Sequence, residues 1–155
     1  VATKVSKLGG LQIVWDEEIQ GKIRTQREKN LPNETGGVLL GYFDLVQHKV
    51  FIVDALAAPP DSHADATSFI RGIQGLEDAV KNAGERTANI VGYVGEWHSH
   101  PRHCSSKPSS YDMVLLAHLA VALEFEGLPA LMLIVGEDQE TWYTGKIDDK
   151  RDIGR

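Results

Sequence analysis

Two histidines separated by one residue, His98 and His100, stand at the end of an apolar run and offer the chemistry of a metal site. Side chains alternate between the two faces of a β-strand, so both imidazoles would project from one face and could bind one ion together. Asp112 follows at the start of a segment with helical character, and its carboxylate could be a third ligand. Three protein ligands leave the fourth position of a tetrahedral zinc ion open, as in catalytic zinc sites.

Glu34, as a candidate base, and Ser109, as a candidate helix cap, are the next residues of interest. Glu34 opens the apolar, glycine-rich segment 35–43, where a carboxylate is unusual, and a water activated by a metal needs a nearby base. Ser109 and Asp112 have the spacing of an N-cap serine and an acidic third helical residue, so Asp112 also has a purely structural interpretation. Both interpretations can hold if the helix begins beneath the strand end. Three other histidines are interpreted as ordinary surface or core residues: His48, His63 and His118.

Hydrophobic periodicity and turn residues predict the elements that position these groups. Strands are expected at residues 11–15, 35–43, 49–57, 89–100, 130–135 and 141–144. Helices are expected at residues 16–29, from Asp16 as N-cap, at 69 to about 82, and at 109–126. The short turn 44–48 joins two strands as a hairpin, so the sheet cannot be entirely parallel. The predicted fold class is therefore α/β (α+β), with a mixed β-sheet packed between helices.

The chain has 155 residues, 42% of them hydrophobic, which is enough for one domain with a proper core. We expect a single domain over residues 1–155, with residues 1–10 and 146–155 flexible because both segments are polar. The formal net charge of -6, without a basic cluster, argues against nucleic acid or an anionic membrane as the main partner. No apolar run approaches the roughly 20 residues that span a bilayer.

The single cysteine bears on the cellular compartment of the chain, and the first residue bears on whether the chain is part of a longer protein. One cysteine cannot form an intramolecular disulfide, which favours a reducing compartment, and we expect a cytoplasmic location. The chain begins at Val1, which would suit a fragment of a longer fusion.

Together these motifs resemble the signature of the JAMM (MPN+) zinc metalloproteases, and more narrowly the prokaryotic JAB branch of that family. The resemblance extends from about residue 34 to residue 135 and is carried by Glu34 before Thr35-Gly36-Gly37-Val38-Leu39-Leu40-Gly41, by His98-Ser99-His100-Pro101 and by Pro108-Ser109-x-x-Asp112. It implies that His98, His100 and Asp112 bind zinc. It also implies that Glu34 is the base for the catalytic water and that Ser109 helps to stabilise the tetrahedral oxyanion.

The loop before Ser109 departs from the family pattern. Residues 101–108 separate the second histidine from the serine, one residue more than the commonest family spacing. Because Ser109 and Asp112 keep their own spacing, we interpret the difference as a one-residue insertion. Cys104 lies in this loop and could compete as third zinc ligand or, beside His103, act as a nucleophile, although an ordinary loop cysteine is the favoured interpretation.

Active members of the family are isopeptidases that remove ubiquitin or ubiquitin-like proteins from lysines or C-terminal extensions. The resemblance implies a zinc-dependent isopeptidase or peptidase that cleaves after the C-terminus of a ubiquitin-like protein. Loops 59–66 and 101–108 are candidates for binding the substrate tail, and an interpretation of both as plain solvent-exposed connections is equally open. Bacterial relatives occur alone or fused to ubiquitin-activating-like and conjugating-like enzymes. Their operons attach a ubiquitin-like modifier or a nucleotidyltransferase to targets, and some act against phage. Two alternatives stay open: processing of a sulfur-carrier protein adduct, and a non-catalytic MPN-type binding scaffold.

Overall fold

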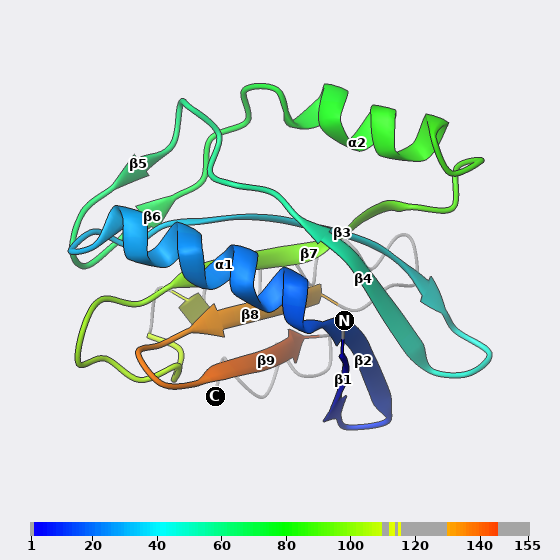
Figure 1. Ribbon diagram of the computed structural model, residues 1–155, viewed down its shortest axis with the longest axis horizontal. Coiled ribbons are helices and arrows are strands. Elements are labelled where there is room, and N and C mark those ends of the chain that lie inside the picture. The colour runs from blue at the N-terminus through cyan, green and yellow to red at the C-terminus, as the bar shows by residue number, and fades with distance from the viewer. Residues whose placement is uncertain (1, 110–111, 114, 116–129, 146–155) are drawn as a thin grey trace.

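The computed structural model describes residues 2–109, 112–113, 115 and 130–145. The strands are β1 (Thr3–Leu8), β2 (Leu11–Asp16), β3 (Gly36–Asp44), β4 (Lys49–Ala55), β5 (His63–Ala64), β6 (Phe69–Ile70), β7 (Gly92–Ser99), β8 (Ala130–Val135) and β9 (Glu140–Gly145). The helices are α1 (Glu17–Asn30) and α2 (Leu76–Glu85). Figure 1 shows α1 lying across the sheet and α2 running beyond the β3 and β7 strands.

Seven strands form one mixed sheet in the order β1-β2-β4-β3-β7-β8-β9, while β5 and β6 pair with each other. The β2–β4 and β7–β8 pairs are parallel, and the other neighbours in the large sheet are antiparallel. The mixed sheet with packed helices confirms the predicted fold class. β7, which leads into the histidine pair, lies inside the sheet between β3 and β8 (Figure 1). Its backbone is therefore paired on both sides, which gives the site a rigid base.

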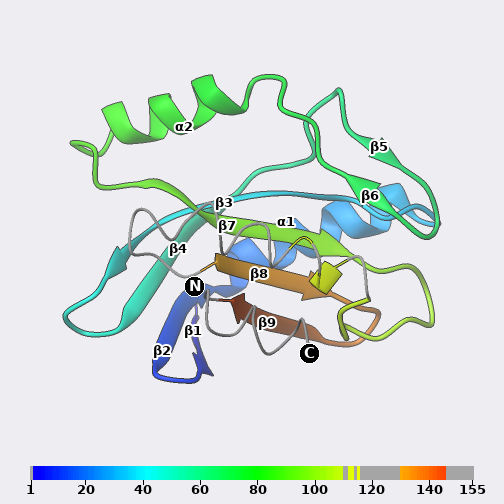
Figure 2. The same cartoon turned by 180° about the vertical axis from the view of Figure 1, so that it is seen from behind.

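Helix α1 covers one face of the sheet. It begins where the Asp16 carboxylate accepts a hydrogen bond from the Ile19 backbone N–H at 2.9 Å, as predicted for an N-cap. Ile19 and Ile23 lie one turn apart and join a buried cluster with Leu39 and Val50 of the sheet. The helix lies in front of the sheet in Figure 1 and behind it in Figure 2. The last turn of α1 lies at the end of β7, where its Arg27 donates to the His100 carbonyl.

The helix predicted from residue 69 is wrong in its first part. Phe69 belongs to β6, which pairs with residues 63–64, and α2 begins only at Leu76. The Asp61 carboxylate accepts hydrogen bonds from the backbone N–H groups of Ile73 and of the residue after it, at 3.0 and 2.9 Å. These contacts from a distant side chain hold the segment in a turn and override its helical periodicity.

The N-terminal segment also differs from the expectation of flexibility for residues 1–10. β1 pairs antiparallel with β2 across a turn at Gly9, whose φ is +59°. Its side chains alternate between exposed and half-buried, so this edge strand needs few apolar residues.

β7 begins at Gly92 rather than at residue 89, because Ala88 and Asn89 have φ values of +54° and +62° that a strand does not accept.

Two other predicted segments lie largely or wholly outside the described residues. Of the helix predicted at 109–126, Ser109, Asp112, Met113 and Leu115 are described, and the last three of these are helical. The tail 146–155 falls outside altogether. Within the described part of the chain, neither helix has the length and apolar character needed to cross a membrane.

Candidate metal centre

The end of β7 brings the two histidines together. His98 is paired in register with Gly36 of β3, where a Cβ would come within 2.8 Å of the His98 Cβ. Gly36 therefore leaves the space that the His98 side chain needs. His100 follows the strand end, and its backbone N–H donates to the Val135 carbonyl at 2.8 Å. The imidazole centroids lie 5.4 Å apart, as the alternation of side chains leads one to expect.

Glu34 lies next to the imidazoles because Ser99 holds the start of β3 against the end of β7. The Ser99 Oγ accepts a hydrogen bond from the Thr35 backbone N–H at 2.9 Å, and the Ser99 backbone N–H donates to the Thr35 carbonyl at 2.7 Å. One ligand atom from each of Glu34, His98 and His100 lies within 4.8 Å of the other two. Sequence spacing could not show this proximity, since it depends on the pairing of β3 with β7.

Asp112 contacts both histidines. Its Oδ1 lies 2.7 Å from Nε2 of His98, and its Oδ2 lies 3.0 Å from Nε2 of His100. The Ser109 backbone N–H donates to Asp112 Oδ2 at 2.7 Å, and the Asp112 backbone N–H donates to Ser109 Oγ at 3.1 Å. This is the reciprocal capping that the spacing predicted. One carboxylate therefore caps the helix start and meets both imidazoles.

The ring nitrogens converge as metal ligands do. Nδ1 of His100 lies 2.8 Å from the Ser105 carbonyl oxygen, a contact that needs a proton on Nδ1, and Nε2 lies 3.0 Å from Asp112 Oδ2. Nε2 of His98 is buried and finds no hydrogen-bond partner among the described residues, although Asp112 is close. Two imidazole nitrogens and a carboxylate are a donor set that suits zinc, and a cation would satisfy the unpaired nitrogen.

The two carboxylates are about equally buried but differ in their contacts. The exposed fractions are 4% for Asp112, 5% for His98, 6% for Glu34 and 8% for His100. Burial raises the pKa of Glu34, although the two histidines act in the opposite direction. Burial acts the same way on Asp112, but its contacts with the imidazoles of His100 and His98 outweigh burial and hold the pKa of Asp112 below its ordinary range. Glu34 is therefore the readier proton acceptor, and Asp112 stays ionised.

The same contacts act on His100. Burial alone would lower the pKa of His100, but its hydrogen bonds to Asp112 and to the Ser105 carbonyl outweigh burial and raise that pKa. The site therefore attracts positive charge at the His100 ring, whether from a proton or from a metal ion.

A pocket of about 180 Å³ opens beside these groups. Its polar lining includes Glu34, His98, Asp112 and Ser109. Thr67, Phe69 and Ile70 also line the pocket, just beyond the loop 59–66 that was expected to grip substrate. The described residues of the loop 101–108 do not appear in its wall.

A partly buried ion pair in the pocket lining was not predicted from the sequence. Glu96 lies two residues before His98, and Arg71 donates to both of its carboxylate oxygens, at 2.5 and 3.0 Å. The Tyr93 hydroxyl donates to Glu96 at 2.8 Å. The sequence held one signal, a glutamate within the apolar strand at the period-two spacing of the histidines.

Cys104 does not reach the histidines. Among the described residues, the group that could hold a metal contains Glu34 and the two histidines but not Cys104. Cys104 is exposed and lies with His103 and Glu137 in a separate surface pocket. The loop around it is nevertheless well fastened, since the Tyr143 hydroxyl donates to the Ser106 carbonyl at 2.9 Å. The structure supports the ordinary loop cysteine.

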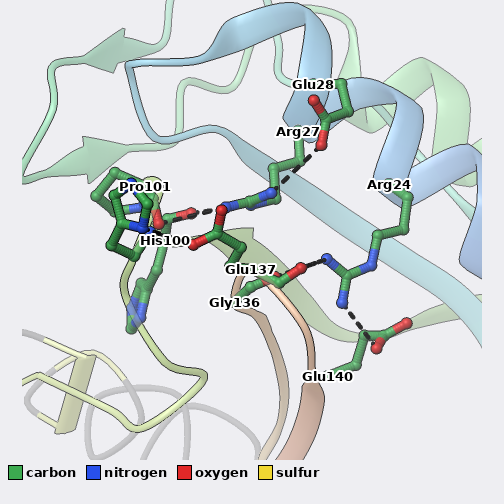
Figure 3. Close-up of polar contacts among 9 residues, drawn as sticks. Arg24, Arg27, Glu28, His100, Pro101, Gly136, Glu137 and Glu140 are labelled. Atoms are coloured by element: carbon green, nitrogen blue, oxygen red, sulfur yellow. Dashed lines mark hydrogen bonds and ion pairs between the residues drawn. The ribbon is translucent and has the colours of Figure 1, made fainter.

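Arg27 is a further residue whose role the sequence did not reveal. Its side chain is only 2% exposed, and it donates to the carbonyl oxygens of His100 and Pro101 at 3.0 and 3.3 Å (Figure 3). The available signal was its position four residues after Ile23, on the buried face of α1.

Comparison with known proteins agrees with this geometry. Residues 16–145 match the family of prokaryotic homologues of the JAB domain. A curated relative from Enterobacter hormaechei subsp. hoffmannii (strain UCI 50), named CD-NTase/cGAS isopeptidase, is 37% identical over 112 residues, which cover 72% of this chain and 60% of the relative. This chain therefore spans less than two thirds of the relative's length.

The fold comparison gives a consistent result. A protein from Desulfitobacterium hafniense, known from its solution structure, superposes with a TM-score of 0.57 at 18% identity over 86% of this chain and 84% of that chain. At this identity the likeness concerns the fold alone. The family match spans most of the chain and confirms the resemblance carried by the motifs: the chain belongs to the prokaryotic homologues of the JAB domain.

Proposed function

We propose that this chain is a zinc-dependent isopeptidase that cleaves after the C-terminus of a conjugated protein. The observation that carries the proposal is the convergence of two imidazoles and Asp112, with Glu34 beside them, at one end of a pocket. The name of the Enterobacter relative supports this reaction class and suggests a CD-NTase/cGAS-type nucleotidyltransferase as the conjugated protein. A ubiquitin-like protein is the other candidate for that position.

The proposed zinc ligands are His98, His100 and Asp112. Asp112 touches both imidazoles and keeps its charge, which favours it over Glu34 as the third ligand. A zinc ion bound there would act as a Lewis acid that polarises the scissile carbonyl and lowers the pKa of water. Glu34 remains as the base, since burial raises its pKa toward the range in which it can accept and return a proton.

The residues divide the hydrolysis between them. Glu34 takes a proton from the attacking water as the water oxygen bonds to the carbonyl carbon, and it gives this proton to the amine as the C–N bond breaks. Ser109 Oγ accepts a hydrogen bond from the Asp112 backbone N–H, which leaves the hydroxyl hydrogen of Ser109 to donate to the oxyanion. The pocket of about 180 Å³ favours a slim, extended tail with small side chains beside the scissile bond.

The proposed context is a bacterial system that conjugates proteins, a class of systems of which some act against phage. Ubiquitin-activating-like and conjugating-like enzymes would make the conjugate that this chain cleaves. Such enzymes are its proposed partners, acting through the shared substrate.

The test compares wild type with Glu34→Gln on two purified isopeptide conjugates, one of a ubiquitin-like protein and one of a CD-NTase. Wild type should contain zinc and release the free C-terminus from at least one conjugate, and a chelator should stop the release. Glu34→Gln should keep its zinc and lose about 10²–10⁴-fold in rate, because it loses only the base. Cleavage by Glu34→Gln at the wild-type rate, or a wild type without zinc, would overturn the proposed mechanism. Binding of a conjugate without cleavage would instead favour the scaffold.

A further inference from the structure

Two arginines that lie one turn apart on helix α1, Arg24 and Arg27, extend toward Gly136 and toward His100 respectively (Figure 3). Arg27 donates directly to the carbonyl of His100. Among the described hydrogen bonds, none joins Arg24 to a histidine, and Arg24 donates instead to the β8–β9 turn. Its Nη1 donates to the carbonyl oxygens of Gly136 and Glu137 at 2.6 and 2.9 Å, and its Nη2 donates to the carboxylate of Glu140, at the start of β9, at 2.9 Å.

The turn that Arg24 holds is joined to the loop after the histidines. The Glu137 backbone N–H donates to the Cys104 carbonyl at 3.1 Å. The Glu137 carboxylate accepts a hydrogen bond from the His103 backbone N–H. Both the main chain and the side chain of Glu137 therefore fix the path of residues 103–104.

Gly136 fixes the next part of the loop by close packing. A Cβ at Gly136 would lie 2.6 Å from backbone atoms of Ser105 and Ser106, closer than a real Cβ contact. The Ser105 carbonyl is the group that accepts the hydrogen bond from Nδ1 of His100, at 2.8 Å. A hydrogen bond at Nδ1 keeps the proton there and leaves Nε2 as the ligand atom. The Ser105 carbonyl therefore favours the tautomer of His100 that leaves Nε2 free to bind a metal ion.

We propose that Arg24 is a positioning residue for His100, and that it acts through the β8–β9 turn and the Ser105 carbonyl. The inference rests on the proposed function in so far as His100 is a zinc ligand. The planar guanidinium suits this task, because its fork donates to two successive carbonyls and a carboxylate at once. Removing Arg24 should loosen the turn, shift the Ser105 carbonyl and allow the His100 ring to carry its proton on Nε2.

The experiment measures zinc affinity and the tautomer of His100 in the full chain. Arg24→Gln removes the fork, and Arg24→Lys keeps the charge but not the fork. Gly136→Ala displaces the same loop without touching α1, so it tests the proposal if Arg24→Gln does not fold. Lys22→Gln is the matched control, because it removes one positive charge from α1 at an exposed pair with Asp54.

Zinc affinity is measured by competition of Zn²⁺ with a chromophoric chelator. We expect a loss of about 10- to 100-fold for Arg24→Gln and Gly136→Ala, as for other outer partners of ligating histidines. A smaller loss is expected for Arg24→Lys and none for Lys22→Gln. Long-range ¹H–¹⁵N spectra of the metal-free protein at alkaline pH should show a smaller share of His100 rings protonated on Nδ1, and a larger share protonated on Nε2 beside Asp112, in the two disruptive variants than in wild type.

Wild-type zinc affinity together with an unchanged His100 tautomer in Arg24→Gln and Gly136→Ala would overturn the inference. An equal loss in Lys22→Gln would also overturn it, because charge alone would then explain the effect. If wild-type protein bound no zinc, the proposed function would fail, and the tautomers of the metal-free proteins would still decide the role of Arg24.

Discussion

Ser99→Ala tests how the fold places Glu34 beside the histidines. Ser99 is fully buried, and its Oγ is the acceptor for the Thr35 backbone N–H at 2.9 Å. Thr35 is itself only 3% exposed, so water cannot replace the lost acceptor without opening the strand pair. A buried N–H left without a partner costs about 1–3 kcal/mol in the free energy of unfolding. For a chain of this size, each kcal/mol lowers the melting temperature by roughly 2–4 °C.

The assay is thermal unfolding of metal-free wild type and Ser99→Ala, followed by zinc content and cleavage rate. Ser62→Ala is the matched control, because Ser62 Oγ also accepts from a backbone N–H, that of Gly72 at 2.9 Å, but both residues are only partly buried. We expect the larger loss of stability in Ser99→Ala, a slower cleavage because Glu34 shifts, and unchanged zinc content. If Ser99→Ala has the same melting temperature as wild type, the stabilising role of the Ser99 hydrogen bond to Thr35 is refuted.

Three further substitutions test packing and charge. Gly37→Ala should destabilise the fold, because a Cβ would lie 2.0 Å from the Leu56 carbonyl oxygen. Gly21→Ala, on the open face of α1, should stabilise the fold by about 0.5–1 kcal/mol. Denaturant unfolding of both variants checks that the free energy of unfolding falls in the first and rises in the second. Glu140→Gln should weaken the fold at neutral pH and lose its effect in acid. Burial opposes ionisation of Glu140, but the hydrogen bonds from Arg24 and residue 20 hold the pKa of Glu140 below its ordinary value of 4.5. Its stabilising contribution is therefore present above pH 4.5 and disappears as the pH falls through the folded-state pKa. Unfolding free energies of wild type and variant should converge in acid, and a constant difference at all pH values would contradict the assignment.

Local patterns were sufficient where the physical cause was local. The N-cap at Asp16 and the reciprocal capping between Ser109 and Asp112 involve residues three apart, and both appear in the structure. The same-face placement of His98 and His100 follows from strand alternation alone. In contrast, the segment from residue 69 was predicted wrongly because its backbone N–H groups bond to the side chain of a distant residue.

The sequence could not show which groups meet across the sheet. Glu34 approaches the imidazoles through the register of β3 on β7, and the buried role of Arg27 depends on the path of the chain after His100. An arginine on a helix rich in charged residues is usually solvated, so the position of Arg27 four residues after Ile23 was a weak signal of burial. Family resemblance supplied the expectation for Glu34, whereas no local signal indicated which groups Arg27 contacts.

The difference between the two carboxylates follows from how each is fastened. Asp112 is held by a backbone N–H and by two imidazoles, all of which favour its charged form. Glu34 is equally buried but owes its place to backbone contacts of its neighbour Thr35, so burial dominates at its own carboxyl group. A site that needs one permanent anion and one exchangeable proton requires this asymmetry. The helix cap and the strand pairing create it before any ligand binds.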